Sequence, residues 1–176
     1  EFIAESLGLV IVNVTFPSRY GGNIRVTMKK NGMPADLSLP RIKEISFIES
    51  FNSLQAIYDS WRSDAQETLS ALYTQGIVHG KSLPGRAVML INALGIDEST
   101  MPIVFEQPKS PKVGNYIPGT KIEVLSDSAL LSHEPTILIV WSWHIIKEVV
   151  EYLDTLGYRG EIWVPLPKFE MYRAAL

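Results

Sequence analysis

Between Gly76 and Pro167 the chain alternates between short runs of β-branched residues and longer amphipathic stretches. Two of the amphipathic stretches run directly into a glycine, Gly95 in one case and Gly157 in the other. Such alternation is typical of a parallel sheet covered by helices, because each parallel strand needs a crossover to reach the next. The predicted fold class is therefore α/β, with strands at 76–78, 103–105, 136–141 and 161–164 and helices at 85–94 and 144–156.

The first 32 residues stand apart from this pattern. Two β-rich runs, 9–14 and 23–29, are separated by Pro17 and Gly21-Gly22. A pair of strands cannot bury a core alone, and open strand edges tend to pair with other strands. We expect these strands to lie exposed, to join the sheet of a missing domain, or to pair with a second copy of the chain.

A linker at 33–45 and a long helix at 46–74 are predicted to follow. Pro34 and Pro40 punctuate the linker. Ser46 and Glu49 have the spacing of a capping box, and apolar residues then recur every three or four positions as far as Leu72. The predicted organisation is a segment 1–32, a linker 33–45 and a main domain 46–176 led by this helix.

The composition excludes several kinds of site. The chain has no cysteine, which rules out disulfides, thiolate metal sites and cysteine nucleophiles. Its formal net charge of −3 gives no general attraction to nucleic acid or to anionic membranes. The histidines, His79, His133 and His144, lie apart without metal-ligand spacing, so we expect no metal site.

The ends and the hydropathy of the chain suggest where the protein is found. Its longest apolar run, Ile137 to Trp143, is far shorter than the roughly 20 residues that a bilayer span needs. The opening is acidic, unlike a signal peptide. We therefore expect a cytoplasmic protein with no membrane partner. Because the chain begins with Glu1 rather than Met, we also expect a fragment or a processed product.

The loop from Gly80 to Arg86 is the first candidate binding segment. Gly80-Lys81-Ser82 lacks the glycine that a nucleotide triphosphatase loop requires five positions earlier, where Gln75 stands. The helix predicted to begin after Pro84 favours an anion at its N-terminus, and Arg86 can pair with a phosphate. The alternative is an ordinary loop that binds nothing.

Two further stretches are candidates. Lys109, Lys112 and Lys121 make the loop around Pro118-Gly119 basic, which favours either a ligand loop or a solvated surface loop. Trp141-Ser142-Trp143-His144 follows the most apolar strand, at the end where open α/β sheets bind ligands. The alternative is that its tryptophan rings cover the core.

Common catalytic and cofactor patterns are missing. No G-x-S-x-G elbow of a serine hydrolase occurs, and no G-x-G-x-x-G dinucleotide fingerprint follows any strand. A free-standing enzyme that uses a nicotinamide cofactor is therefore the least favoured function.

Several short sequence patterns occur together in a fixed order. Lys112 to Thr120 matches K-x-G-x-Y-x-P-G-T, and Gly80 to Asn92 falls on G-Y-G-A-P-A-K-G-N-T-L-L-N with Ser82 at the second glycine and Arg86 at the lysine. Tyr20-Gly21-Gly22 falls on H-G-G, and Gly160 to Pro167 falls on G-G-x-x-I-V-P-L-P. Together they resemble the C-terminal part of the S-adenosylmethionine-dependent sugar C-methyltransferases.

The resemblance implies a fold and a function. The fold would be a Rossmann-like domain preceded by two strands left from a methyltransferase sheet. The substrate would be a nucleotide-linked, usually dTDP-linked, keto-deoxysugar. S-adenosylmethionine would serve the intact enzyme, whose methyl-donor residues, zinc cysteines and catalytic His and Tyr belong to upstream regions. This chain is therefore expected to bind substrate without catalytic residues of its own.

The resemblance and the candidate loops together give the predicted substrate-binding residues. They are Gly80, Ser82, Pro84, Arg86, Asn92, Lys112, Tyr116, Thr120, Trp143 and His144. The function we expect is the nucleotide-sugar-binding portion of a C-methyltransferase. The alternative is a non-enzymatic interaction module that keeps the same scaffold.

Overall fold

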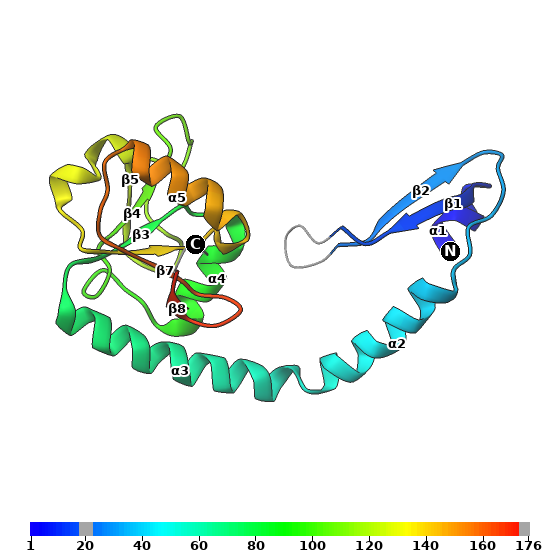
Figure 1. The fold of residues 1–176 in the computed structure, drawn as a ribbon, viewed down its shortest axis with the longest axis horizontal. Coiled ribbons are helices and arrows are strands. Elements are labelled where there is room, and N and C mark those ends of the chain that lie inside the picture. Colours follow the sequence, from blue (N-terminus) through cyan, green and yellow to red (C-terminus); the bar gives the residue numbers. More distant parts are fainter. Residues whose placement is uncertain (18–22, 173–176) are drawn as a thin grey trace. The chain divides into compact units, whose positions relative to one another are not determined.

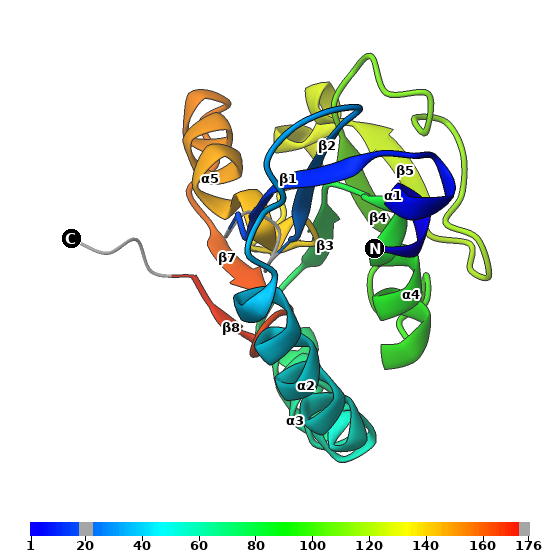
Figure 2. The ribbon, with the colours of Figure 1, turned by 90° about the vertical axis from the view of Figure 1, so that its right-hand side faces the viewer.

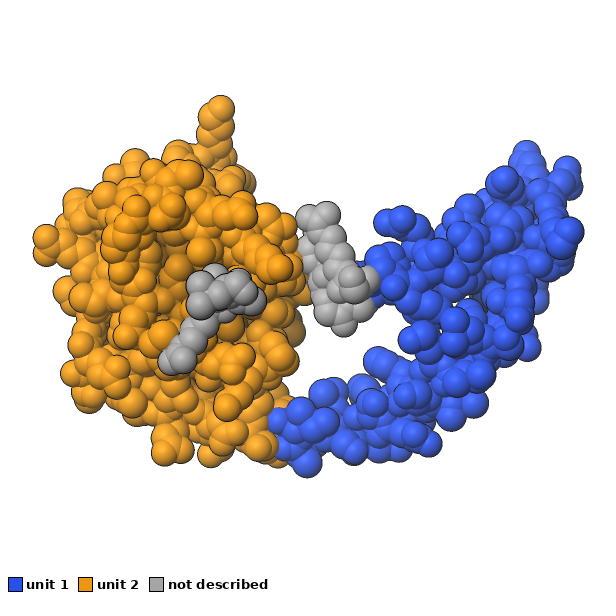
Figure 3. All heavy atoms as spheres, in the orientation of Figure 1, with its two compact units in different colours: residues 1–57 blue, residues 58–176 orange. Residues whose placement is uncertain are grey.

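The computed structural model describes residues 1–17 and 23–172. It divides into two compact units, Glu1–Ile57 and Tyr58–Leu176, which are coloured separately in Figure 3. The predicted Tyr20-Gly21-Gly22 turn lies outside the described residues. No described helix is long and apolar enough to cross a membrane.

The described residues of the first unit form two short strands, two helices and the start of a third helix. Helix α1 (Phe2–Ser6) precedes strand β1 (Val10–Thr15), which pairs antiparallel with β2 (Arg25–Lys29). The two predicted strands therefore hydrogen-bond to each other. Helix α2 (Ser38–Asn52) follows these strands in the chain.

Helix α2 begins well before Ser46, so much of the segment predicted as a linker is helical. The Asp36 carboxylate accepts hydrogen bonds from the Ser38 backbone N–H at 2.9 Å and from the Ser38 hydroxyl at 3.0 Å. Pro40 does not interrupt the helix, because backbone N–H groups in a first turn have no helical partner to lose. The capping box predicted at Ser46 is wrong, since Ser46 lies inside α2.

The helix predicted at 46–74 is two helices. Helix α2 ends before Ser53 and α3 (Leu54–Gln75) follows. In α3 the predicted apolar stripe is buried at Ala65, Leu69 and Leu72. Helix α2 buries no residue, and its apolar side chains are exposed: Leu39, Ile42, Ile45, Phe47, Ile48 and Phe51.

The second unit is built on a mostly parallel sheet of six strands (Figure 1). The sheet order is β5-β4-β3-β6-β7-β8, and every pair is parallel except β7 with β8. The predicted fold class is confirmed. The strands are β3 (Val78–Lys81), β4 (Ile103–Glu106), β5 (Glu123–Ser126), β6 (Ile137–Val140), β7 (Glu161–Val164) and β8 (Glu170–Met171).

Helices cover both faces of this sheet. Helices α4 (Gly85–Leu94) and α5 (Ile146–Thr155) lie on opposite sides of the strands in Figure 2. One core cluster joins α3 and α4 to one face through residues such as Leu72, Ile91 and Val104. The other joins α5 to the opposite face through Phe105, Leu138 and Leu153. Short 3₁₀ turns link the strands: η2 (Asp127–Ala129), η3 (Leu131–His133) and η4 (Trp143–Ile145).

A buried histidine lies in the middle of this second core. His79 is only 4% exposed, and its ring centre is 5.7 Å from that of Phe105 and 6.1 Å from that of His133. Its Nδ1 atom has no hydrogen-bond partner among the described residues. Burial lowers the pKa of His79, and the charge of His133 lowers it further.

We expect this histidine to make the unit less stable in acid. Its pKa lies below the unfolded value of about 6.5, so the unfolded chain binds the proton first as the pH falls. The free energy of unfolding should therefore decline below about pH 6.5, by at most about 1.4 kcal/mol per pH unit from this one group. Urea unfolding between pH 7.5 and 5 should show a shallower decline in His79→Gln. Equal slopes in the two proteins would contradict the explanation.

Candidate functional site

The best candidate site is a hollow at the carboxyl ends of the central strands. The chain runs from β3 outward to β4 and β5, then returns to β6 on the other side of β3. This change of direction is the topological switch point, where open α/β sheets bind ligands. A hollow of about 340 Å³ lies there, within the size range of ligand pockets. It is lined by Lys81, Ser82, Leu83, Pro84, Glu106, Gln107, Lys112, Ser142, His144, Ile145, Glu148, Val149 and Tyr152.

One wall of the hollow is a clamp between two loops. Glu106, at the end of β4, accepts hydrogen bonds from the backbone N–H of Leu83 and of Gln107, each at 3.0 Å. Lys112 donates to the Leu83 carbonyl and lies 3.6 Å from the Glu106 carboxylate. Burial alone raises the pKa of Glu106, but these N–H groups and the charges of Lys112 and Lys81 outweigh it. The pKa of Glu106 is therefore below its ordinary value, and the group is a carboxylate at neutral pH.

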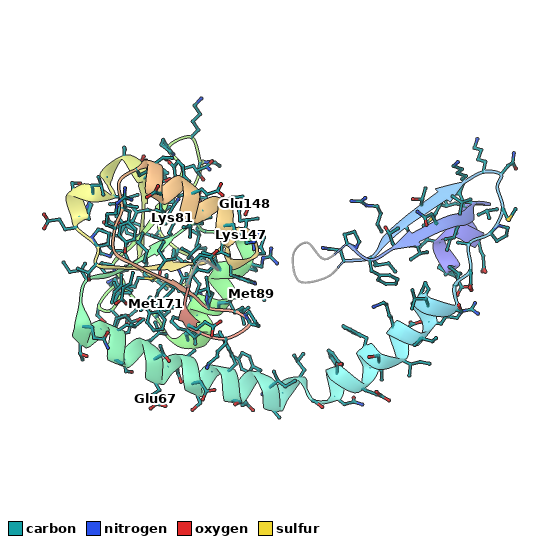
Figure 4. All side chains as sticks on the ribbon, in the orientation of Figure 1. Glu67, Lys81, Met89, Lys147, Glu148 and Met171 are labelled. Carbon is teal, nitrogen blue, oxygen red and sulfur yellow. The ribbon has the colours of Figure 1, made fainter. Side chains whose placement is uncertain are left out.

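A second charged pair lies beneath the hollow. The ammonium of Lys81 is 2.9 and 3.0 Å from the two carboxylate oxygens of Asp127, and the side chains are 2% and 1% exposed. Lys81 also lies 5.4 Å from the centre of the Tyr152 ring. Burial raises the pKa of Tyr152, and the neighbouring Asp127 raises it further. Figure 4 labels Lys81 on β3 and Glu148 on α5, two of the lining residues.

Ser142 supplies a polar group that the described residues leave unpaired. It is 4% exposed and is the second residue after the end of β6. Its hydroxyl has no hydrogen-bond partner among the described residues, yet the residue lines the hollow. Because buried polar groups are nearly always hydrogen-bonded, such a hydroxyl indicates a ligand or water position.

Another hollow in this unit is a weaker candidate. It measures about 630 Å³ and lies at the amino-terminal ends of β6 and β7, beside Thr136 and Glu161. That is the end of a parallel sheet opposite to where ligands bind. None of its described lining residues has a buried polar atom without a partner.

The structure brings four of the predicted site residues together around the first hollow. They are Ser82, Pro84, Lys112 and His144. Arg86 and Trp143 are not among the lining residues, but they contact each other, with the guanidinium carbon 4.9 Å from the centre of the Trp143 ring. The Trp143 ring in turn meets that of His144 edge to face at 5.6 Å. Gly80 lies within β3, where the sheet packs closely.

The other three predicted residues lie outside the hollow. The Asn92 amide donates to the carbonyls of Val88 and Pro118. The Thr120 hydroxyl donates to the Ile117 carbonyl. Tyr116 is 59% exposed. The contact of Asn92 with Pro118 joins the loop to α4, and the contact of Thr120 holds the loop internally.

The predicted site residues leave out six polar lining residues: Lys81, Glu106, Gln107, Ser142, Glu148 and Tyr152. Lys81 and Ser142 lie within the candidate stretches of the sequence, but neither was predicted as a site residue. Four of them had a signal in the sequence, because they lie at or just beyond the end of a strand. Lys81 and Glu106 are the last residues of β3 and β4, Gln107 follows β4, and Ser142 is the second residue after β6. Polar residues at those positions meet at one edge of a parallel sheet. Glu148 and Tyr152 enter from α5, and only tertiary packing brings them there.

The strand order defines a class of protein, a Rossmann-like α/β domain, and this domain has a hollow at its switch point. Comparison with known protein families then shows to which family the chain belongs. The family model described as "C-methyltransferase C-terminal domain" matches residues 18–167, and the chain belongs to this family. The predicted resemblance to C-methyltransferases is confirmed. No curated protein matches the chain.

Proposed function

We propose that this chain is the part of a C-methyltransferase that binds a nucleotide-linked sugar, and that the sugar nucleotide occupies the hollow at the switch point. Family membership supports a role in C-methylation. The observation that carries the proposal is the hollow with the unpaired Ser142 hydroxyl on its wall. A sugar nucleotide is rich in hydroxyls, and these would pair with that group.

The charged groups suggest how such a ligand would lie. Arg86 belongs to the first turn of α4, beside the hollow, and is the cation we assign to the diphosphate. Lys112 is engaged by Leu83 and Glu106, so we assign it to the clamp that holds the loops. The Trp143 ring, which contacts the Arg86 guanidinium, would hold it in place through a cation–π interaction. The chain thus supplies binding and orientation.

The methyl donor does not fit the described residues of the first unit. An S-adenosylmethionine site needs a strand, a glycine-rich loop and a helix in succession. In the first unit β1 and β2 are antiparallel neighbours, and no described helix lies between them. We therefore assign no part of the methyl-donor site to the described residues of the first unit.

Titration calorimetry with UDP and dTDP tests the proposal. Arg86→Ala should weaken binding by roughly tenfold or more, because a charge-assisted hydrogen bond is lost. Arg62→Ala, which removes the same charge from an exposed site on α3, is the control and should leave the affinity unchanged. Ser142→Ala should weaken binding several-fold without lowering the melting temperature, because it removes a buried hydroxyl that lacks a partner. If the chain binds neither UDP nor dTDP, the proposal is overturned.

A further inference from the structure

The loop after β3 keeps two of the three glycines of a nucleotide-binding turn, and a serine stands at the remaining position. Gly80, Ser82 and Gly85 stand at the three glycine positions of G-x-G-x-x-G. Ser82 has a φ of 65°, a left-handed conformation that glycine usually provides. Gly80 has no room for a side chain, and α4 begins at Gly85. The literal glycine pattern is absent because a serine stands at the second position, in a backbone conformation that glycine usually provides.

Glu106 stands where such folds hold a ribose. It ends β4, the strand that neighbours β3 on the side away from β6. In nucleotide-binding sheets of this order, an acidic residue near that position accepts hydrogen bonds from ribose hydroxyls. Its side chain is 13% exposed and lines the hollow.

The hydrogen bonds of Glu106 leave room for two more. One oxygen accepts from the Leu83 N–H and the other from the Gln107 N–H. A carboxylate oxygen has two lone-pair positions, so each oxygen keeps one acceptor position. Lys112, at 3.6 Å, is too distant to fill either with a hydrogen bond. Two adjacent acceptors in a fixed orientation match two adjacent hydroxyls.

The same carboxylate disfavours a phosphate at this wall. It occupies the Leu83 N–H, one of the backbone donors that a phosphate at the loop would use. It also carries a negative charge into the hollow. The ligand must therefore present hydroxyl groups to Glu106 and place its phosphates elsewhere.

We infer that Glu106 recognises a pair of adjacent hydroxyls on the ligand, and that these are the 2′- and 3′-hydroxyls of a ribonucleotide. The inference rests on the proposed function and narrows it to ribonucleoside diphosphate carriers. A deoxyribonucleotide such as dTDP offers only one of the two hydroxyls. The hexose of a sugar nucleotide could supply the same chemistry, and the experiment separates the two sources.

The experiment compares matched ligands rather than absolute affinities. UDP and 2′-deoxy-UDP differ by one ribose hydroxyl, and dTDP and dTDP-glucose differ by the hexose. We expect the wild-type chain to bind UDP about tenfold more tightly than 2′-deoxy-UDP. In Glu106→Gln the ratio should fall to about twofold or less. Because the ratio is taken within one protein, a partial loss of folded material does not change it.

Two variants complete the test. Glu106→Asp keeps the charge but shortens the side chain, so this variant should also lose the preference for UDP over 2′-deoxy-UDP. Glu151→Gln removes a charge from an exposed position on α5 and should keep it. Equal ratios in wild type and Glu106→Gln, with both nucleotides bound, would overturn the inference and leave the proposed function standing. If Glu106→Gln changes only the preference for dTDP-glucose over dTDP, the ribose assignment is overturned and the two hydroxyls belong to the hexose. No binding of any ligand would overturn both.

Discussion

Replacing Asp127 by alanine should lower the free energy of unfolding of the second unit by roughly 3–5 kcal/mol. Asp127 and Lys81 are 1% and 2% exposed and pair at 2.9 Å. Removal of the carboxylate leaves the ammonium of Lys81 buried without its counter-charge, which costs far more than the loss of one hydrogen bond. The free energy of unfolding of a domain of this size is about 5–15 kcal/mol in total. The variant should therefore be close to unfolding at ambient temperature.

The control for this prediction removes both charges together. Lys81→Met with Asp127→Leu should recover most of the loss, because a buried pair can often be replaced by apolar groups at little cost. The exposed pair between Arg159 and Asp154 provides a second comparison, since its side chains are 68% and 72% exposed. Asp154→Ala should change the stability by no more than about 1 kcal/mol. Chemical denaturation measures all three. If Asp127→Ala lowers the free energy of unfolding no more than Asp154→Ala does, the buried pair does not matter for stability.

The second large loss of stability is expected at Gly80, where there is no room even for a methyl group. A Cβ atom there would lie 2.5 Å from Val104 Cγ2 and 2.8 Å from Trp141 Nε1. The Trp141 ring is fully buried, so it cannot move aside freely. Gly80→Ala should therefore cost roughly 1–3 kcal/mol through overpacking.

Gly85, the first residue of α4, is the matched comparison. A Cβ atom there meets nothing within 4 Å, and the backbone is not in the left-handed region. Gly85→Ala should raise the stability by about 0.4–1 kcal/mol, because alanine restricts the unfolded chain more than glycine does. Thermal unfolding of the two variants should therefore show shifts of opposite sign. A stabilising Gly80→Ala would mean that the sheet can open at this point.

Much of the fold followed from local patterns in the sequence. The α/β class, the strand at 161–164 and the helix that ends at Gly95 were predicted because hydrophobic periodicity and glycine caps act within a few residues. The break at Ser53 and the early start of α2 were not. The apolar residues of α2 are spread around the helix instead of lying on one face, so its ends cannot be recognised from an apolar stripe. Strand β5 was missed because it follows a long loop and is only partly buried.

The candidate site divides in the same way. The sequence by itself determined that loops near Gly80, Lys112 and Trp143 carry polar and aromatic residues, and that the chain contains no cysteine. Only the tertiary structure decided which of them meet, because the sheet order places the ends of β3, β4 and β6 side by side. It also decided that Glu106 faces the loop after β3, that Lys81 pairs with Asp127 from 46 positions away, and that Asn92 fixes a loop instead of lining the hollow. Such contacts join residues far apart in the chain, and no local propensity encodes them.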